Sequence, residues 1–527
     1  LIEKGRENVL LQSNQFDTTW VKAGNGLAVL TTGQTGYDGS SNAWLFSKPS
    51  ASFVGIYQDT SINGVITLSM YLKAGTNSTA IVRIIGTNDN QFFVNLSNGT
   101  SSFASSSIID YDIEDVGGGW YRTSISVNNS GSARVLLYPE APFNATTAGN
   151  ILIQDAQLEQ GLVATPYIET GASTAQAGIL EDLPRLDYSG GASCPSLLLE
   201  PLRSNLVTQS EYFGSSYWTK VDSSVVGGFT SPEGLSNAYK LVEDTGGTTH
   251  SLSVINASNQ TGYRTWSIYA KAGERNWFVI NAYYGGNYKT YFDLTNGVVG
   301  TSASGNTSTI TKLANGWYRC SVTRTSVTPY TIYNGYVVAE ADNNDSYTGD
   351  GTSGVYIYGA QLETGSYPTS YIPTYGSAVT RSGENNVLGT PISLDGDFAL
   401  FWEGTALEDN LHIYGSGNTE WYINILGSAG RIVLDTNTGR KVQAVSNNFV
   451  IGAKAKLAIR RESGNYNIFF NGVKLTNIIS VNNTETLSLS SFFWGYSSAY
   501  YKGIKVNQSL VFEMALTDSE CIALTTI

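Results

Sequence analysis

Short segments in which apolar and polar residues alternate recur along the whole chain. SMYLKAG (Ser69–Gly75) and SIYAKAG (Ser267–Gly273) alternate between two sides and then stop at a glycine, which is typical of β-strands. Turns rich in Gly, Asn, Ser and Thr separate such segments, and no helical periodicity runs through them. Asn98-Gly99 and Asn296-Gly297 have the composition of type I′ hairpin turns, because both residue types tolerate positive φ. The pattern predicts an all-β protein built from β-sandwiches.

A long internal repeat organises the first part of the chain. The matching blocks occur in the same order at offsets between 195 and 204 residues. They are Leu1–Ser13 with Leu198–Ser210, Trp20–Lys22 with Trp218–Lys220, Ser41–Trp44 with Ser236–Tyr239, Ser69–Gly75 with Ser267–Gly273, Asn95–Gly99 with Asp293–Gly297, Gly119–Ser126 with Gly316–Thr323, and Ala156–Glu159 and Tyr167-Ile168 with Ala360–Glu363 and Tyr371-Ile372. This predicts two homologous domains in tandem. Because the match already begins at Leu1, we expect more protein before it in the parent polypeptide.

The repeat sets the expected domain boundaries. The first copy covers residues 1–171, a connector 172–197, the second copy 198–375, and a different sandwich 376–527. The connector is rich in small residues and contains Pro184 and Pro195, which favours a linker or a small hairpin.

The last unit carries its own local signals. Lys456–Leu475 is expected to form strand, turn, strand, turn and strand, with Gly464-Asn465 and Asn471-Gly472 at the turns. Thr517 and Glu520 have the spacing of a capping box, which predicts a short helix through Leu524.

Composition excludes several classes of function. Charged residues make up 14% of the chain and aromatic residues 12%, and the formal net charge is −13. No basic run is longer than two residues, as in Arg460-Arg461, so nucleic-acid binding is not expected. No apolar stretch approaches the roughly 20 residues of a membrane-spanning helix. Three scattered cysteines, Cys194, Cys320 and Cys521, form neither a disulfide framework nor a zinc motif.

The sequence gives little support for catalysis. The two histidines, His250 and His412, lack metal-binding spacing and are interpreted as surface or hairpin residues. There is no G-x-S-x-G elbow and no Walker-type glycine loop. A pair of carboxylates would suffice for a glycosidase, so a polysaccharide hydrolase or lyase stays open.

One repeated carboxylate is better explained by structure. Glu159 and Glu363 recur at the same place in both copies, which suggests a backbone or arginine partner that each copy needs. Arg122 and Arg319, which follow the repeated Gly-Trp-Tyr, are the candidate partners.

Two motifs carry a family resemblance. GDGTSGVYIYGAQLETGSYPTSYIPT (Gly349–Thr374), with a looser copy at Asp155–Thr170, resembles the closing strands of carbohydrate-binding-module-like jelly rolls in bacteriophage tail and head fibre proteins. Pro184–Leu206 is similar to the connector that often precedes such domains. FFNGVKL (Phe469–Leu475) and LTDSEC (Leu516–Cys521) resemble a concanavalin/laminin-G-type sandwich. The resemblance implies a virion surface protein that contacts host-surface polysaccharide or spaces other modules, and it implies a trimer.

Aromatic residues are the candidate sugar contacts, because pyranose rings present apolar C–H faces to Trp and Tyr while Asn and Asp bind hydroxyls. Aromatics kept in both copies are assigned to the shared core: Trp20/Trp218, Trp44/Tyr239, Trp120/Trp317 and Tyr121/Tyr318. Divergent ones are the better ligand candidates, with core or edge packing as the alternative for each. The candidates are Trp277, Asn281, Tyr283, Tyr284, Asn287 and Tyr288 in the second copy, and Trp421, Tyr422, Trp494, Tyr496, Tyr500 and Tyr501 in the last unit.

A loop of the second copy offers hard oxygen ligands. Asp342, Asp345 and Asp350 suit calcium by residue type, although their spacing is not that of an EF-hand and such loops are commonly simple turns. The resemblance to jelly rolls implies a structural calcium here.

Together these observations predict tandem jelly-roll β-sandwiches followed by a laminin-G-like sandwich, acting without catalysis as a virion fibre or adhesin. Glycan would bind weakly to exposed aromatics and gain avidity in a homo-oligomer. Two alternatives stay open: a capsid or tail decoration that contacts other virion proteins, and a polysaccharide depolymerase.

Overall fold

The protein is almost entirely β-structure and divides into two compact units. The computed structural model describes residues 5–103, 105–178, 185–188, 195–384, 386–415, 421–426, 430–446, 448–492 and 502–527. One unit comprises Leu1–Leu180, Asn205–Glu363 and Tyr371–Val379, and the other Glu181–Ser204, Thr364–Ser370 and Thr380–Ile527. In the described residues, helical structure is confined to η1 (Ala314–Gly316) and α1 (Asp518–Thr525). None of the helices described is long and apolar enough to cross a membrane.

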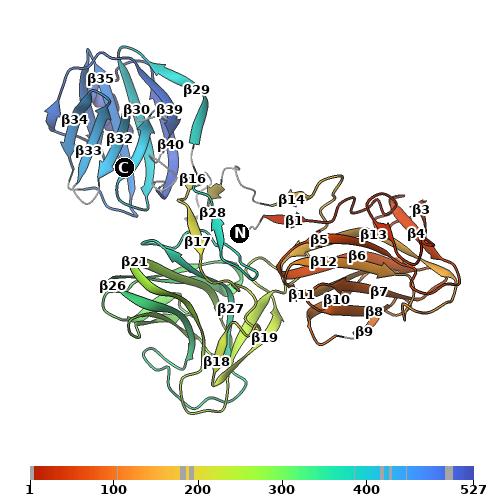
Figure 1. Ribbon diagram of the computed structural model, residues 1–527. Helices are drawn as coiled ribbons and strands as arrows, with labels where there is room; N and C mark the ends of the chain where they lie inside the picture. The colour runs from red at the N-terminus through yellow and green to blue at the C-terminus, as the bar shows by residue number, and fades with distance from the viewer. Residues whose placement is uncertain are drawn as a thin grey trace. The chain divides into compact units, whose positions relative to one another are not determined.

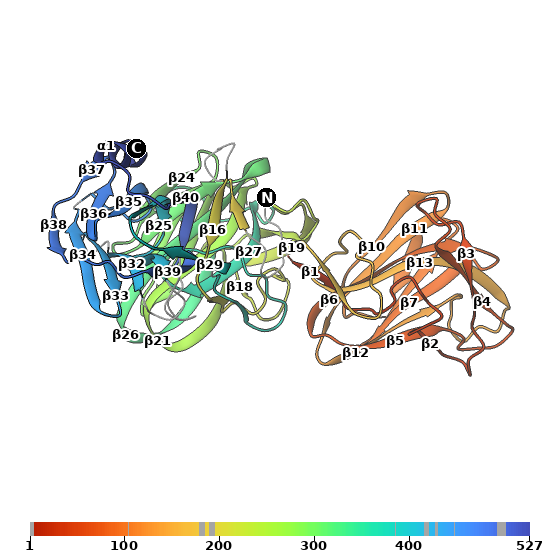
Figure 2. The ribbon, with the colours of Figure 1, turned by 90° about the horizontal axis from the view of Figure 1, so that it is seen from above.

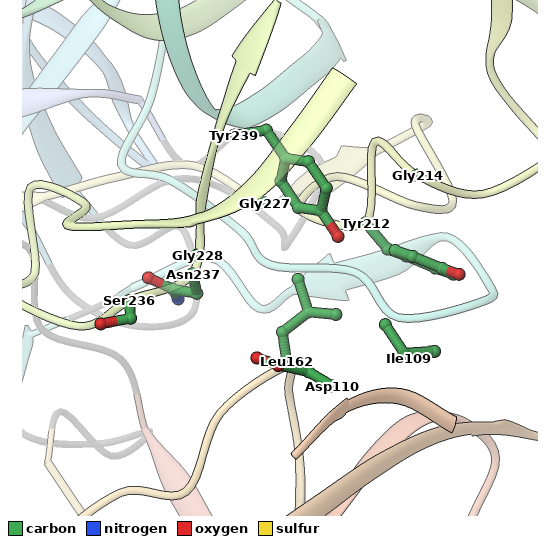
Figure 3. A pocket seen from close by; sticks show the side chains of 10 residues that line it. All are labelled: Ile109, Asp110, Leu162, Tyr212, Gly214, Gly227, Gly228, Ser236, Asn237 and Tyr239. Atoms are coloured by element: carbon green, nitrogen blue, oxygen red, sulfur yellow. The ribbon is translucent and has the colours of Figure 1, made fainter. Parts of the chain in front are cut away.

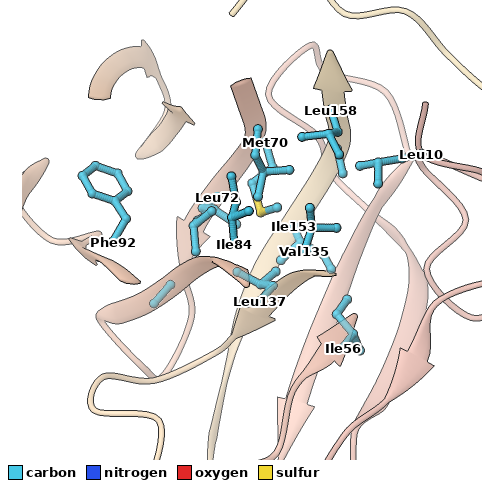
Figure 4. Packing of buried hydrophobic residues seen from close by; sticks show 14 of the residues in the cluster. Leu10, Ile56, Met70, Leu72, Ile84, Phe92, Val135, Leu137, Ile153 and Leu158 are labelled. Atoms are coloured by element: carbon cyan, nitrogen blue, oxygen red, sulfur yellow. The ribbon is translucent and has the colours of Figure 1, made fainter. Parts of the chain in front are cut away.

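The first copy is a sandwich of two six-stranded antiparallel sheets (Figures 1 and 2). One sheet has the order β10 (Ile108–Gly117), β11 (Trp120–Asn129), β6 (Gly64–Ala74), β13 (Gly149–Gln160), β4 (Ala43–Lys48), β3 (Val29–Gln34). The other has the order β2 (Val21–Lys22), β5 (Ile56–Ser61), β12 (Ser132–Tyr138), β7 (Thr79–Ile85), β8 (Asp89–Asn95), β9 (Thr100–Phe103). Alternate residues of both sheets point inward and pack in a fully buried core that includes Leu72, Ile84 and Val135 (Figure 4).

The second copy has the same plan, but two long strands join its sheets. They are β21 (Ser251–Ala272) and β26 (Trp317–Ala339), which pair over most of their length. The remaining strands are β18 (Thr219–Val221), β19 (Ser223–Phe229), β20 (Ala238–Glu243), β22 (Trp277–Tyr284), β23 (Lys289–Asp293), β24 (Val298–Ser302), β25 (Thr307–Lys312) and β27 (Gly354–Thr364). The hydrogen-bonded path runs β19-β20-β27-β21-β26-β22-β23-β24, with β18 on β21 and β25 on β26.

The C-terminal sandwich consists of two seven-stranded sheets. One has the order β15 (Arg185–Asp187), β16 (Ser196–Leu199), β40 (Ile504–Phe512), β30 (Phe398–Ala406), β35 (Lys454–Glu462), β36 (Asn465–Phe470), β37 (Val473–Lys474). The other has the order β29 (Asn386–Leu394), β39 (Leu487–Phe492), β31 (Leu411–Gly415), β32 (Trp421–Leu426), β33 (Arg431–Thr436), β34 (Gly439–Val445), β38 (Asn477–Ser480). Two small sheets pair β1 (Arg6–Asn8) with β14 (Ala175–Ala177) and β17 (Arg203–Asn205) with β28 (Val379–Arg381).

The segment expected to connect the two copies supplies strands to different neighbours. Its first part contains β14, which pairs with β1 of the first sandwich. Its end contains β15 and β16, which form an antiparallel pair, and β16 continues the sheet of the C-terminal sandwich through β40.

Several local predictions are confirmed, and one is wrong. The capping box of α1 is present, with Glu520 N–H donating to Thr517 Oγ1 and Thr517 N–H donating to the Glu520 carboxylate. Both residues of the Asn471-Gly472 turn have positive φ. Asn98-Gly99 and Asn296-Gly297, however, do not form type I′ turns, because in each pair only the glycine has positive φ. Each glycine instead ends a longer loop, where Gly99 N–H donates to Asn95 O and Gly297 N–H to Asp293 O.

The aromatics shared by the two copies serve the fold as expected. All of them are buried apart from Tyr121, which is half-buried. The indole N–H groups of Trp20 and Trp218 make equivalent bonds, to Gln12 O and Gln209 O.

A buried asparagine fastens the start of each sandwich to its closing strand. Asn8 Nδ2 donates to Ala156 O and Ile168 O, and Asn8 Oδ1 accepts from the N–H groups of Leu10 and Leu158. Asn205 repeats all four bonds in the second copy. Both side chains are fully buried, so each amide satisfies four backbone groups that would otherwise lack partners.

We predict that Asn8→Ala and Asn205→Ala each destabilise their own sandwich by about 2–4 kcal/mol, since four buried backbone groups lose their partner. Differential scanning calorimetry measures the effect as a lowered transition temperature. Asn128→Ala, at an exposed position of β11, is the control and should change the unfolding free energy by less than about 0.5 kcal/mol. Transition temperatures as high as that of the control would contradict this role.

Candidate functional site

Strand alternation separates the glycan-contact candidates of β22 onto two faces. Asn281 and Tyr283 point away from the core of the second sandwich, whereas Tyr284 lies in it, 1% exposed, and donates from its hydroxyl to Gly262 O. The expectation that Tyr284 contacts a ligand is therefore wrong, because neighbouring residues of a strand face opposite sides.

The outer face around Tyr283 combines an aromatic row with a polar row. Register pairs Ile255 of β21 with Tyr333 of β26, and Tyr333 with Tyr283 of β22. The two tyrosine rings meet edge to face with centroids 4.6 Å apart. Ile255 is 60% exposed, and both tyrosines are half-buried. These side chains form a short apolar ridge across three strands.

The adjacent row on the same face is polar, with a glycine at its centre. Register places Ser253, Gly335 and Asn281 side by side on β21, β26 and β22. Gly335 is buried, and a Cβ there would lie 3.2 Å from Asn281 Cβ, so Asn281 packs closely over this position. Asn281 is oriented by its neighbours: Nδ2 donates to Asn287 Oδ1 at 2.7 Å, and Oδ1 accepts from Tyr288 N–H. We call the six residues of the two rows the sheet-face site.

The other candidates of the second copy lie around this site. Asn287 is exposed and reaches the site through its bond to Asn281. Tyr288 is half-buried against the core side, and the Arg324 guanidinium covers its ring at 3.2 Å from the centroid. Trp277 lies at the far end of β22, partly buried, with its ring against Gly300. Neither Trp277 nor Tyr288 adds a free ring to the sheet-face site.

The loop expected to bind calcium packs over the far end of the same face. Asp345 accepts from the Tyr291 hydroxyl at 2.7 Å and from Lys289 Nζ at 2.5 Å. Asp342 accepts from the backbone and hydroxyl of Thr301, while Asp350 binds the next residues of its own turn. The three carboxylates thus have separate partners, and no group of three His, Cys, Asp or Glu residues in the described chain is arranged to hold a metal ion. The calcium site stays a prediction.

The first copy places an ion pair where the second copy has its apolar ridge. By strand order and register, Asp59, Arg134 and Ile85 occupy the places of Ile255, Tyr333 and Tyr283. The places of Ser253, Gly335 and Asn281 are taken by Tyr57, Leu136 and Arg83. Arg134 donates to both carboxylate oxygens of Asp59 at 2.6 and 2.8 Å, and its guanidinium lies 4.1 Å from the centre of the Tyr57 ring. The apolar ridge of the second copy is therefore not a general property of the fold.

The C-terminal candidates are described only in part. Tyr422 is half-buried, and its ring stacks on His412 with centroids 4.8 Å apart and planes at 8°. Trp494, Tyr496, Tyr500 and Tyr501 lie outside the described residues, as does the side chain of Trp421.

Both histidines have structural surroundings. His250 is fully buried, which corrects the expectation of a surface residue, and its ring nitrogens contact Asp222 O at 2.7 Å and Tyr347 O at 3.2 Å. Burial lowers the pKa of His412 to about 4. Neither ring is arranged as a general base near neutral pH.

The repeated glutamate has a structural role, but Arg122 is not its partner. Glu159 accepts from the N–H and hydroxyl of Thr165, and its nearest cation is Arg6 at 3.8 Å. Arg122 instead donates to the carbonyl of Thr165. In the second copy, Gln361 donates to Glu363 at 2.8 Å, and Arg319 donates to Ser267 Oγ at 3.1 Å.

Asp155 is the carboxyl group with the most perturbed titration in the first copy. It is 6% exposed and accepts from the Tyr37 hydroxyl at 3.0 Å. Burial, followed by the charges of Asp38 and Glu169, raises its pKa to about 6. Its backbone has φ 52° at the place where Gly359 has φ 63° in the second copy, so this position serves a bulge of the closing strand in both copies.

Sequence reasoning missed four of the six residues of the sheet-face site: Ser253, Ile255, Tyr333 and Gly335. They lie on two long strands remote in sequence from Tyr283, and only the strand register brings them together. The repeat offers one signal, since Tyr333 replaces Arg134 at the equivalent place of the second copy.

Comparisons with known proteins found only distant structural similarities. No protein-family model and no curated protein sequence matches the chain. Among solved structures, a heptameric SAP-like pentraxin from Limulus polyphemus is 12% identical, with a TM-score of 0.23, covering 26% of this chain and 73% of its own. The CBM40 module of the Ruminococcus gnavus IT-sialidase, bound to α2,3-sialyllactose, is 13% identical (TM-score 0.21; 28% and 98%). Domains LG4-5 of the mouse laminin α1 chain are 11% identical (TM-score 0.20; 52% and 90%). Similarity at this level supports no conclusion about this chain.

Because the pKa of Asp155 is raised, the stability of the fold is expected to depend on pH. The folded state binds the proton more tightly than the unfolded state, so this group destabilises the fold increasingly as the pH rises from about 4 to about 6. Asp155→Asn should therefore raise the transition temperature at pH 7.5, by an amount equivalent to at most about 3 kcal/mol, and change it little at pH 4. Thermal unfolding at both pH values measures the difference, with exposed Asp17→Asn as control. An equal shift at both pH values would contradict the assignment.

Proposed function

We propose that the chain is a non-enzymatic glycan-binding protein and that the sheet-face site of the second copy is its binding surface. The observation that carries the proposal is the pairing of two rows on one exposed face: Ile255, Tyr333 and Tyr283 beside Ser253, Gly335 and Asn281. A pyranose has the matching two-sided character, with C–H groups on its faces and hydroxyl groups around its edge.

Each row has a definite part in this arrangement. The ridge offers an apolar contact for one face of a sugar ring. Asn281 is held by two hydrogen bonds, so its amide loses little side-chain entropy when it binds a hydroxyl. Gly335 lets Asn281 pack closely beside β26, because a Cβ at this position would lie 3.2 Å from Asn281 Cβ.

The first copy supports the proposal by contrast. At the places of Tyr333 and Ile255 it carries the Arg134–Asp59 pair, so two charged groups that satisfy each other replace part of the apolar ridge. The two copies share their buried hydrogen bonds and differ on this face, as expected if the fold is common and the binding function belongs to one copy.

The setting we propose is a virion surface, with a homo-oligomer, in the form of a trimer, bound to host-surface polysaccharide. The resemblance of the AQLE…YIPT signature to phage fibre jelly rolls supports this setting. A single shallow site binds weakly, and several copies held together raise the apparent affinity by about 10²–10⁴.

Binding to immobilised glycans tests the proposal. The biotinylated full-length chain, displayed on streptavidin, should bind a subset of a polysaccharide and oligosaccharide array. Gly335→Arg, which places a long charged side chain at the centre of the face and would displace Asn281, and Tyr283→Ala, which removes a ring contact, should each lower the apparent affinity at least about tenfold.

Arg134→Ala is the matched control, because it alters the equivalent face of the first copy and should leave the array signal unchanged. Thermal unfolding confirms that each variant is folded. A signal that survives both Gly335→Arg and Tyr283→Ala, or the absence of any glycan signal, would contradict the proposal.

A further inference from the structure

A pocket of about 370 Å³ lies within the first compact unit, away from the sheet-face site. Figure 3 shows Ile109, Asp110 and Leu162 of the first copy opposite Tyr212 and Tyr239 of the second. Three glycines, at positions 214, 227 and 228, also line it. Its volume falls in the range of about 300–1,000 Å³ that is usual for small-molecule sites.

The two walls of the pocket are fastened together by specific contacts. Val65 N–H donates to Tyr375 O at 3.0 Å, and Gly64 has no side chain where a Cβ would overlap that carbonyl. Arg6 forms an ion pair with Glu233 at 2.8 Å. Leu162 itself belongs to the buried hydrophobic cluster of the second copy. These contacts therefore hold the two walls of the pocket together.

Asn237 leaves an unused acceptor in this pocket. Its side chain is 3% exposed, and Oδ1 has no hydrogen-bond partner among the described residues. Nδ2 donates to Glu211 Oε2 at 3.4 Å. Because a carboxylate oxygen accepts, the amide nitrogen faces Glu211 and the oxygen is left without a donor. A buried polar atom without a partner is costly, and a bound donor would remove that cost.

The repeat shows that this burial depends on the packing of the two copies. Asn42 is the counterpart of Asn237 in the SNAW and SNAY blocks, and it is exposed. The equivalent asparagine is thus exposed in the first copy and part of a pocket wall in the second.

The side chains that line the pocket favour a neutral ligand with hydroxyl groups. Asn237 Oδ1 and the carboxylate of Asp110 are acceptors, while the hydroxyls of Tyr212, Tyr239 and Ser236 can donate or accept. Burial raises the pKa of both tyrosines, which keeps their hydroxyls neutral. No Lys, Arg or His is among the described lining residues, so nothing there would neutralise an anionic ligand.

We infer that this pocket is a second binding site, for a neutral pyranose. A hydroxyl of the sugar donates to Asn237 Oδ1, and its C–H faces lie against Tyr212 and Tyr239. The inference concerns a site apart from the sheet-face site and does not depend on it.

Titration with single sugars tests the pocket. Saturation-transfer NMR and calorimetry would use methyl α-glucoside, methyl α-galactoside, methyl α-mannoside and N-acetylglucosamine as neutral probes, and N-acetylneuraminic acid as the anionic one. At least one neutral probe should bind saturably with one site per chain, and the anionic probe should bind at least about tenfold more weakly.

Two variants test whether the sugar binds in this pocket. Ser236→Trp, at an exposed position of the pocket, should weaken it at least about tenfold by filling the space, and Asn237→Ala should do so by removing the acceptor. Ser41→Trp makes the same change at the exposed counterpart in the first copy and should have no effect. If Asn237→Ala fails to fold, Ser236→Trp alone shows whether the sugar binds in the pocket.

Three results would overturn the inference: no saturable binding of any neutral probe, binding that survives Ser236→Trp, or equal binding of the anionic probe. Gly335→Arg distinguishes the two sites. Loss of sugar binding in Gly335→Arg but not in Ser236→Trp would support the sheet-face site and exclude the pocket. The reverse pattern would support the pocket, and the glycan array with Gly335→Arg and Tyr283→Ala would then decide the sheet-face site separately.

Discussion

One buried asparagine in each of the two related sandwiches holds the fold together. Asn8 and Asn205 lie where the chain enters its sandwich, and each amide binds four backbone groups of the entering segment and the closing strand. A β-sandwich must satisfy the backbone of its irregular first segment as well as that of its strands. A single asparagine side chain meets that requirement here. Gln157 and Gln361 of the AQLE motifs add one bond each, because their side-chain oxygens accept from the N–H groups of the isoleucines in the YI motifs.

This fixed frame lets the outer faces differ. A residue on the outer face of a sheet can change without disturbing the core, because strand alternation separates the two sides. In the first copy this face carries an arginine paired with an aspartate. In the second copy the same place carries a tyrosine between an isoleucine and a second tyrosine. We infer that both copies share the same scaffold and that one outer face of the second copy binds glycan.

The sequence predicted most of the fold and little of the site. The repeat, the β-sandwich class, the core aromatics and the helix cap all depend on local pattern, and local pattern is visible in a sequence. The sheet-face site depends on register between β21, β26 and β22, which join residues up to about 80 positions apart. Tyr284 was misplaced because a cluster of aromatics in one strand was treated as one surface. Arg122 was misplaced because sequence neighbourhood to a repeated motif does not identify an ion-pair partner.

The most direct test of the account is a crystal structure of the full chain with a glycan that it binds. The account predicts electron density for a pyranose ring against Tyr283 and Tyr333, with a hydroxyl within hydrogen-bond distance of the Asn281 amide. Density for the glycan elsewhere, with this face covered by another subunit, would contradict the central claim that the open sheet face of the second copy is the binding surface.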